Sequence, residues 1–317
     1  MSGGVEAAKA IDGIRNIFNQ EDTEAMILVD AANAFNNLNR NASLLNMDAI
    51  CPEFTKYYYK IQLYVNGMDD GRYILSEEGS TQGDNAAMNL YACSIKPLMC
   101  HLSRDDIYTS INVPKAKQVW YADDSSAAGK IESLFVWWKA LEEAGPLLGY
   151  HPEPTKCHII VKNSECFQKA AALFSGTGVK ITMNGRPFLG SFIGTPSYLK
   201  NSMELKVKEW VKDIEQISEI AVAEPHAAYY GYMNSLSRRW QFLLRTTKNS
   251  SETLQPLEDA IKDVFIPALV GRKITQHERT IFAPPTRFGG MGIANPCDEA
   301  DSEYNISTKT CYQTTVR

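Results

Sequence analysis

Apolar residues follow two different spacings along this chain, and the change falls near residue 196. Before it, short apolar runs at Ile27–Val29, Val119–Tyr121 and Cys157–Val161 have the length of buried strands. After it, apolar residues recur every three or four positions, the spacing of an amphipathic helix, at Val207, Trp210, Val211, Ile214 and Ile217. The pattern predicts an α+β fold with a mostly antiparallel sheet and packed helices, followed by an α-helical bundle.

Helical spacing also occurs between the strand-like runs and in the second part of the chain. We expect helices at residues 1–20, 42–66, 131–145, 226–245 and 254–269. Pro267 is expected to end or kink the last of these helices. The polar residues 297–317 are expected to form a loose tail.

Turn-forming residues predict two hairpins and one tight turn. One hairpin is expected over residues 64–76, around the glycines at 67 and 71. A second is expected over residues 179–190, with its turn at Asn184–Gly185. The small residues 125–129 follow the second apolar run and are expected to form a turn.

Composition limits the classes of function that the chain can serve. The chain has 317 residues, 44% of them hydrophobic and 22% charged, so its length and apolar content are enough for one large or two modest globular units. Its formal net charge is −5. Non-specific affinity for nucleic acid comes chiefly from Lys and Arg that neutralise phosphates, so an acidic chain is a poor nucleic-acid coat. Local basic groups either follow a nucleic-acid backbone or form solvated helix faces; they are Lys206/Lys208/Lys212, Arg238–Arg239 and Arg272–Lys273.

Targeting and redox signals favour an intracellular protein that is not secreted and has no membrane partner. The chain has no run of 18 apolar residues and no charged-then-apolar leader. Its seven cysteines are scattered and lack the paired spacing of zinc sites, so we expect reduced thiols. The oligomeric state is left open.

Two of the apolar strands end in carboxylates. Asp30 follows the run Ile27–Val29, and Asp123 and Asp124 follow Val119–Tyr121. A buried carboxylate without a partner costs several kcal/mol, so a cation is its natural companion. If the two strands lie side by side, Asp30 and Asp123 can share a pair of divalent cations, as in phosphoryl and nucleotidyl transfer. The alternative is that Asp30 caps a helix and the other two acids occupy a solvated turn.

These segments, with three others in the same order, resemble the palm of a reverse transcriptase. The residues Asp30–Asn36 (DAANAFN), Ser80–Asp84 (STQGD) and Tyr121–Asp124 (YADD) are similar to its first three motifs. Gly149–Tyr150 with Lys156 resembles the fourth, and Phe188–Gly190 (FLG) the fifth. Five motifs in order are far more specific than YADD alone. The likeness is greatest to the enzymes of cellular retroelements, particularly animal transposons.

The resemblance implies a metal site and a division of the chain. Asp30 and Asp123 would be the principal ligands of two Mg²⁺ ions, with Mn²⁺ as a substitute. Asp124 would complete the carboxylate set, and Ala31 would offer its backbone carbonyl. The implied segments are a remnant fingers helix at 1–20, a palm at 21–195, a helical thumb-like region at 196–296 and the tail at 297–317.

The resemblance also assigns residues to the nucleotide. Phe35 would lie under the sugar and disfavour a 2′-hydroxyl, and the alternative is an ordinary core residue. Gln82 and Gly83 would contact nucleotide or template, and the alternative is a plain helix cap, while Asn85 stands where relatives carry Pro. Lys156 would approach the departing pyrophosphate.

Two features modify these assignments. Glu153 stands where relatives usually have Asn, so the alternative for Lys156 is a solvated pair with Glu153. Leu189 and Gly190 would belong to the hairpin that holds the 3′ end of the growing strand, and the alternative is a hairpin without that role.

The implied activity is RNA-directed DNA polymerisation, with an RNA template, a DNA primer and deoxynucleoside triphosphates as partners. The alternative is a catalytically degenerate nucleic-acid-binding remnant, because only the last helix of the fingers is expected before the palm. An RNA-dependent RNA polymerase shares the paired acids but is disfavoured by Phe35.

Overall fold

The computed structural model describes residues 2–58, 62–64, 73–75, 78–80 and 87–315. By internal packing the chain divides into two compact units. One is formed by residues 13–183, and the other by residues 1–12 together with 184–317. The first contains the main sheet and the second is largely helical, so the class is α+β.

The first unit is built on a mixed sheet whose described strands have the order β4-β5-β1-β6-β7. β5 pairs antiparallel with both β4 and β1, β1 pairs antiparallel with β6, and β6 pairs parallel with β7. A small second sheet pairs β2 with β3, which confirms the hairpin expected there, although its turn lies outside the described residues. The strands are β1 Ala25–Val29, β2 Gln62–Tyr64, β3 Tyr73–Leu75, β4 Lys117–Tyr121, β5 Asp124–Gly129, β6 His158–Val161 and β7 Lys180–Thr182.

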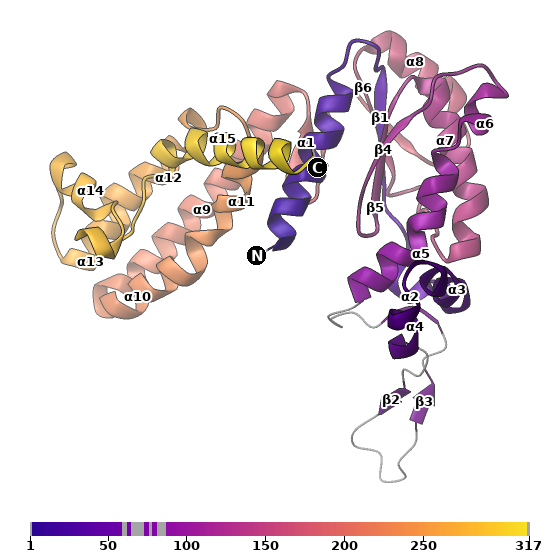
Figure 1. Ribbon diagram of the computed structural model, residues 1–317. Coiled ribbons are helices and arrows are strands. Elements are labelled where there is room, and N and C mark those ends of the chain that lie inside the picture. Colours follow the sequence, from indigo (N-terminus) through magenta and orange to yellow (C-terminus); the bar gives the residue numbers. More distant parts are fainter. Residues whose placement is uncertain (1, 59–61, 65–72, 76–77, 81–86, 316–317) are drawn as a thin grey trace. The chain divides into compact units, whose positions relative to one another are not determined.

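Helices α7 and α8 cover one face of this sheet (Figure 1), where α7 packs on β1 and β5, and α8 packs on β6 and β7. Trp137 and Trp138 of α7 are fully buried in the core. Within the expected helix at 42–66, the described residues form parts of two shorter helices, α3 and α4, and then strand β2. The helices are α1 Ser2–Phe18, α2 Ala34–Asn37, α3 Arg40–Ile50, α4 Pro52–Tyr58, α5 Ala87–Leu102, α6 Asp105–Thr109, α7 Ile131–Ala144, η1 Gly145–Leu148 and α8 Ser164–Leu173.

Residues 125–129, expected to form a turn, belong to strand β5, which lies between β4 and β1. The two acid-tipped apolar strands, β1 and β4, are therefore not direct neighbours. Ser125, Ser126, Ala127 and Ala128 are all 0% exposed. Their small side chains suit a position deep in the sheet, where larger neighbours fill the space above and below.

The hairpin expected to turn at Asn184–Gly185 also differs. β8 Gly185–Phe188 pairs with β9 Ser191–Gly194, so the turn falls at Leu189–Gly190. Both residues have left-handed backbone, with φ of 49° and 76°, as two-residue hairpin turns require. Gly185 serves the pairing instead, because a Cβ there would lie 2.5 Å from the backbone oxygen of Ile193.

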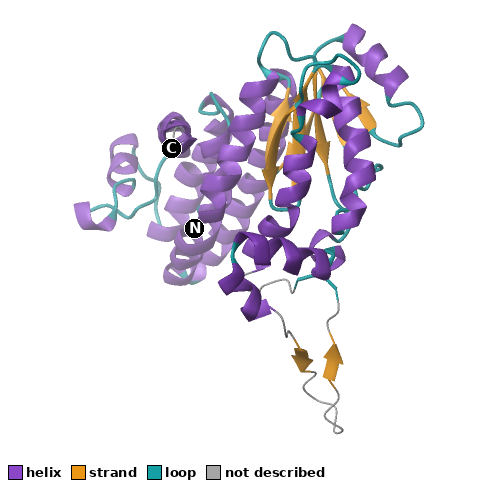
Figure 2. Ribbon diagram, turned by 45° about the vertical axis from the view of Figure 1, so that its right-hand side comes forward, coloured by secondary structure: helices purple, strands orange, loops and turns teal. Residues whose placement is uncertain are grey.

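The second unit contains the β8–β9 hairpin and the helices that follow it. Figure 2 draws helices in purple and strands in orange. Each of the helices expected at 226–245 and 254–269 is interrupted by a π-helical turn. Pro267 lies in the first turn of α13, directly after the second interruption. The elements are α9 Pro196–Ala223, α10 Pro225–Gly231, η2 Tyr232–Leu236, α11 Arg238–Thr246, η3 Glu252–Leu254, α12 Gln255–Ala260, η4 Ile261–Phe265, α13 Ile266–Val270, α14 Gln276–Phe282, η5 Thr286–Phe288 and α15 Pro296–Thr315.

The segment expected to be a loose tail is the helix α15. It packs on α11, where Ala300 is fully buried and Glu303 accepts a 2.8 Å hydrogen bond from Arg245. Tertiary contacts therefore order a segment whose composition is polar. Among the helices that the structure describes, none has an apolar stretch long enough to cross a membrane.

Candidate active site

Three acidic residues come together at one end of strands β1 and β5. The register pairs Val29 with Ser125, so the next position along each strand, Asp30 and Asp124, lies at the same end of two neighbouring strands. Asp123 occupies the two-residue turn between β4 and β5, because Tyr121 pairs with Asp124. The paired strands thus bring together residues almost a hundred positions apart.

The charges of these acids act on one another. The pKa of Asp124 is raised to about 6, first by burial and then by the charges of Asp123 and Asp30. A carboxylate that is half-buried beside two others is destabilised unless a cation compensates the charge. The Asp30 side chain is 50% exposed, so this end of the sheet is open to an incoming ion.

Tyr150 fixes the backbone of the hairpin that carries Asp123. Its hydroxyl donates a hydrogen bond of 3.0 Å to the Asp123 carbonyl oxygen and lies 2.8 Å from Ser125 Oγ. The ring is fully buried and lies 5.3 Å from the Trp120 ring between centroids. Burial also raises the pKa of the hydroxyl well above its usual range, so it stays a proton donor. The turn at Ala122, with φ of 52°, is therefore held from within the core.

The loop at 151–156 approaches the tip of β1 from the other side. Ala32 donates a 2.8 Å hydrogen bond to the carbonyl of His151, and Glu153 donates one of 2.9 Å to the carbonyl of Asp30. These bonds flank the bridge between Ala31 and Pro152 and do not use the Ala31 carbonyl. The backbone oxygen of Ala31, next in the chain to Asp30, therefore accepts neither of these two hydrogen bonds.

Lys156 forms an ion pair with Asp30 rather than with Glu153. Its Nζ is 4.0 Å from Asp30 Oδ1, and the lysine side chain is 63% exposed. The Glu153 carboxylate accepts a hydrogen bond of 2.9 Å from Thr155 instead. An exposed ion pair at this distance contributes little to stability, so the lysine is free to exchange Asp30 for another anion.

Phe35 is half-buried and packs against the core beside the acids. Its ring stacks on Tyr91 of α5, with centroids 4.6 Å apart. Its carbonyl accepts a 2.8 Å hydrogen bond from the backbone of Ser80, the first residue of the STQGD motif. Gly79 permits this approach, because a Cβ there would lie 2.5 Å from the Asn36 oxygen. The first and second motifs thus meet at Phe35.

Four other candidate residues do not belong to the described part of the first unit. Gln82 and Gly83, together with Asn85, lie outside the described residues. Leu189 and Gly190 form the β8–β9 turn of the helical unit, where the Cβ position of Gly190 is 3.5 Å from the Phe242 ring. Their assignments stay predictions.

The donor set suits a hard divalent cation by type and by charge. Carboxylate and carbonyl oxygens are the ligands that Mg²⁺ and Mn²⁺ prefer. Burial, and then the charges of Asp123 and Asp30, raise the pKa of Asp124, and a bound cation would oppose both effects. Within the described part of the chain, the side chains form no group of three or more His, Cys, Asp or Glu close enough to bind one ion together. A metal would therefore bind to two carboxylates, completed by backbone oxygen or water.

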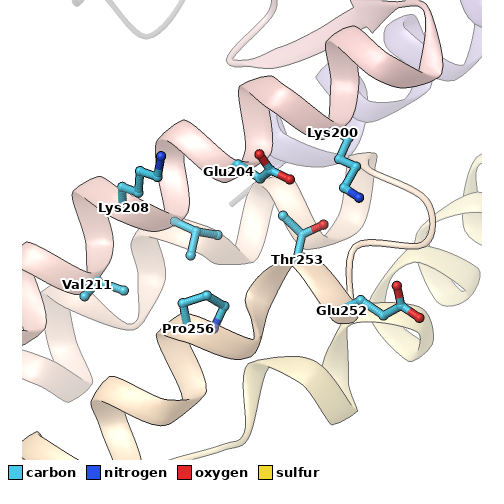
Figure 3. Close-up of a pocket in the computed structure, with 8 residues that line it drawn as sticks. Lys200, Glu204, Lys208, Val211, Glu252, Thr253 and Pro256 are labelled. Carbon is cyan, nitrogen blue, oxygen red and sulfur yellow. The ribbon is translucent and has the colours of Figure 1, made fainter.

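Each basic patch of the helical unit has one residue paired with an acid. Lys206 lies 2.7 Å from Glu209, Arg272 lies 2.6 Å from Glu278, and Arg239 pairs with Asp213. A cavity of about 520 Å³ between α9 and the stretch from η3 into α12 has charged side chains of both signs around apolar ones (Figure 3). These surfaces are therefore mixed in charge. Non-specific binding of phosphates depends on surfaces that are mainly basic.

Sequence reasoning did not single out Tyr91, and it gave Ser80 no contact with Phe35. Tyr91 lies in an apolar helical run, and its position against Phe35 depends on how α5 packs. The one available signal was a tyrosine at a buried position of that helix, since a buried hydroxyl needs a partner.

Comparison with known proteins adds nothing to this assignment. No protein-family model matches the chain, and no curated protein matches its sequence.

Proposed function

We propose that this chain is an RNA-directed DNA polymerase that extends a primer by two-metal nucleotidyl transfer. The observation that supports the proposal is the convergence of Asp30, Asp123 and Asp124 at one sheet end, with the pKa of Asp124 raised to about 6. The order of the five motifs supports the same reading. Perturbed carboxylates gathered at strand ends are typical of functional sites.

The residues have separate tasks in this proposal. Asp30 and Asp123 would hold the ions, which when bound favour ionisation of the primer 3′-hydroxyl and offset the charge of the triphosphate. Lys156 would leave Asp30 for the departing pyrophosphate, where its positive charge offsets developing negative charge. Phe35, held by Tyr91, would exclude a 2′-hydroxyl from the sugar site.

One observation favours a second candidate, a nucleic-acid-binding protein without turnover. The three acidic side chains are not close enough together to hold one ion in the described structure, and the charge of Lys156 lies 4.0 Å from Asp30 Oδ1. A chain in which this pair persists would bind template and incorporate nothing.

Primer extension separates the two candidates. The chain is incubated with poly(rA)/oligo(dT), dTTP and either Mg²⁺ or Mn²⁺, and template binding is measured in parallel by filter titration. We expect Asp123→Asn to abolish incorporation while template affinity stays nearly unchanged, because only the acidic cluster is altered. Asp48→Asn, at an exposed position on α3, is the matched control and should extend normally.

Two outcomes contradict the polymerase proposal. Unchanged extension by Asp123→Asn would remove the acids from the reaction. Template binding by the wild-type chain without incorporation would favour the second candidate. Efficient use of ribonucleotides by the wild-type chain would instead indicate an RNA polymerase and count against the role of Phe35.

A further inference from the structure

Tyr91 carries a buried hydroxyl that has no hydrogen-bond partner among the residues that the structure describes. The residue lies on α5 and is 1% exposed. A buried O–H group without a partner destabilises the folded state, so native proteins seldom keep one without a reason.

The surroundings of this hydroxyl point toward the acidic cluster. The Tyr91 ring stacks on Phe35, with centroids 4.6 Å apart. Burial, and then the charges of Asp123 and Asp124, raise the pKa of the hydroxyl, so it keeps its proton at neutral pH. The hydroxyl is therefore a donor on which the charges of Asp123 and Asp124 act, and carboxylates are strong acceptors.

Tyr108 shows how a tyrosine with only a packing role is satisfied in the same core. It is also 1% exposed, and its hydroxyl donates a 2.9 Å hydrogen bond to the carbonyl of Leu102. Tyr150 is satisfied as well, through the Asp123 carbonyl and Ser125. Tyr91 differs from both because its hydroxyl has no acceptor in the described part of the chain.

We propose that Tyr91 is a positioning residue whose hydroxyl donates to the Asp123–Asp124 carboxylate pair when a divalent cation binds there. The inference rests on the proposed function, because it takes the acids to be the metal ligands. Tyr150 holds the backbone of the hairpin tip, and Tyr91 would then orient its side chains. Hydrogen bonds to ligating groups commonly set their orientation and with it the metal affinity.

The test measures Mn²⁺ binding and thermal unfolding of the full chain. Mn²⁺ alone is the probe, and its free concentration is followed by electron paramagnetic resonance. Tyr91→Phe keeps the ring that stacks on Phe35 and removes only the hydroxyl. We expect about tenfold weaker Mn²⁺ binding, the lower end of the effect of losing such a partner, with an unfolding temperature that is unchanged or raised.

Tyr108→Phe is the matched control. It removes a hydroxyl that has a protein acceptor, so the unfolding temperature should fall while Mn²⁺ affinity stays within the error of the wild type. The two variants therefore predict opposite patterns in the two measurements. A role in packing alone would not lower metal affinity while leaving stability intact.

The outcomes separate this inference from the proposed function. If Tyr91→Phe binds Mn²⁺ like the wild type while Asp123→Asn does not bind it, the role of Tyr91 is refuted and the metal site stands. A lower unfolding temperature for Tyr91→Phe would also refute it, because the hydroxyl would then have a partner within the protein. If the wild type and Asp123→Asn bind Mn²⁺ equally, or neither binds it, both proposals fail.

Discussion

Asp124→Asn should stabilise the fold at neutral pH, although it removes a residue of the candidate site. The folded state raises the pKa of Asp124 from an ordinary 3.8 to about 6, so folding favours the protonated form. One pKa unit corresponds to about 1.36 kcal/mol, so that difference corresponds to at most about 3 kcal/mol of unfolding free energy. The side chain is only half-buried, and solvent screening reduces the expected gain to about 1–2 kcal/mol.

The pH dependence of this effect has a definite sign. Below pH 3.8 the carboxyl is protonated in both states and no penalty exists. The penalty grows as pH rises from 3.8 toward 6 and is fully present above that range. Asparagine resembles the protonated form and avoids the penalty at every pH, so its advantage should be small near pH 4 and largest above pH 6.

Urea denaturation at about pH 4 and about pH 7.5 measures both free energies. We expect Asp124→Asn to exceed the wild type by about 1–2 kcal/mol at the higher pH and by less than about 0.5 kcal/mol at the lower pH. Mg²⁺ should stabilise the wild type at the higher pH and narrow the gap. Equal or lower stability of the variant at about pH 7.5, without metal, would refute the reasoning.

Two further predictions concern positions that support the fold. Gly149→Ala should lower the free energy of unfolding by at least about 2 kcal/mol, since φ is 79° and a Cβ would lie 1.9 Å from the Asn37 oxygen. Gly176→Ala, where φ is 78° but nothing lies within 4 Å of the Cβ position, should lower it by about 1 kcal/mol. Chemical denaturation measures both losses. Equal losses would contradict the packing argument. Arg279→Met should lower the free energy of unfolding by about 3–5 kcal/mol, because it leaves Glu258 charged and buried without its 2.7 Å partner. The double variant Glu258→Leu/Arg279→Met removes both charges and should recover most of that loss. A double variant as unstable as the single one would show that packing, and not the buried charge, causes the loss.

The local pattern of apolar residues was sufficient to predict an element where one face of that element is buried. The apolar run Ile27–Val29 ends β1, and the spacing through Trp210 and Ile214 predicted α9, whose buried face includes both residues. The helix at 131–145 follows the same logic, with Trp137 and Trp138 in the core. In each case the residues that repeat in sequence are the ones that the fold buries.

Local pattern failed where tertiary contacts decide. Residues 125–129 have the composition of a turn, and only their place between β1 and β4 makes them a strand. Helix α15 is polar, and its contacts with α11 order it. The turn at Leu189–Gly190 was missed because Asn184–Gly185 is the stronger sequence signal for a hairpin.

For the candidate site, too, the sequence predicted some features and tertiary packing decided others. The motifs in the sequence marked Asp30, Asp123, Phe35 and Lys156, and the structure brings these residues to one end of the sheet of the first unit. Their supporting contacts could not be predicted, because the stacking of Tyr91 on Phe35 and similar contacts depend on the docking of α5.

A crystal structure of the chain with Mn²⁺ tests the central claim most directly, because anomalous scattering locates the ion independently of the protein. The account predicts a Mn²⁺ ion bound by carboxylate oxygens of Asp30 and Asp123, at about 2.1–2.2 Å as hard divalent cations bind oxygen. A saturated crystal with the ion elsewhere, or with the two carboxylates bound to no shared metal, would contradict it.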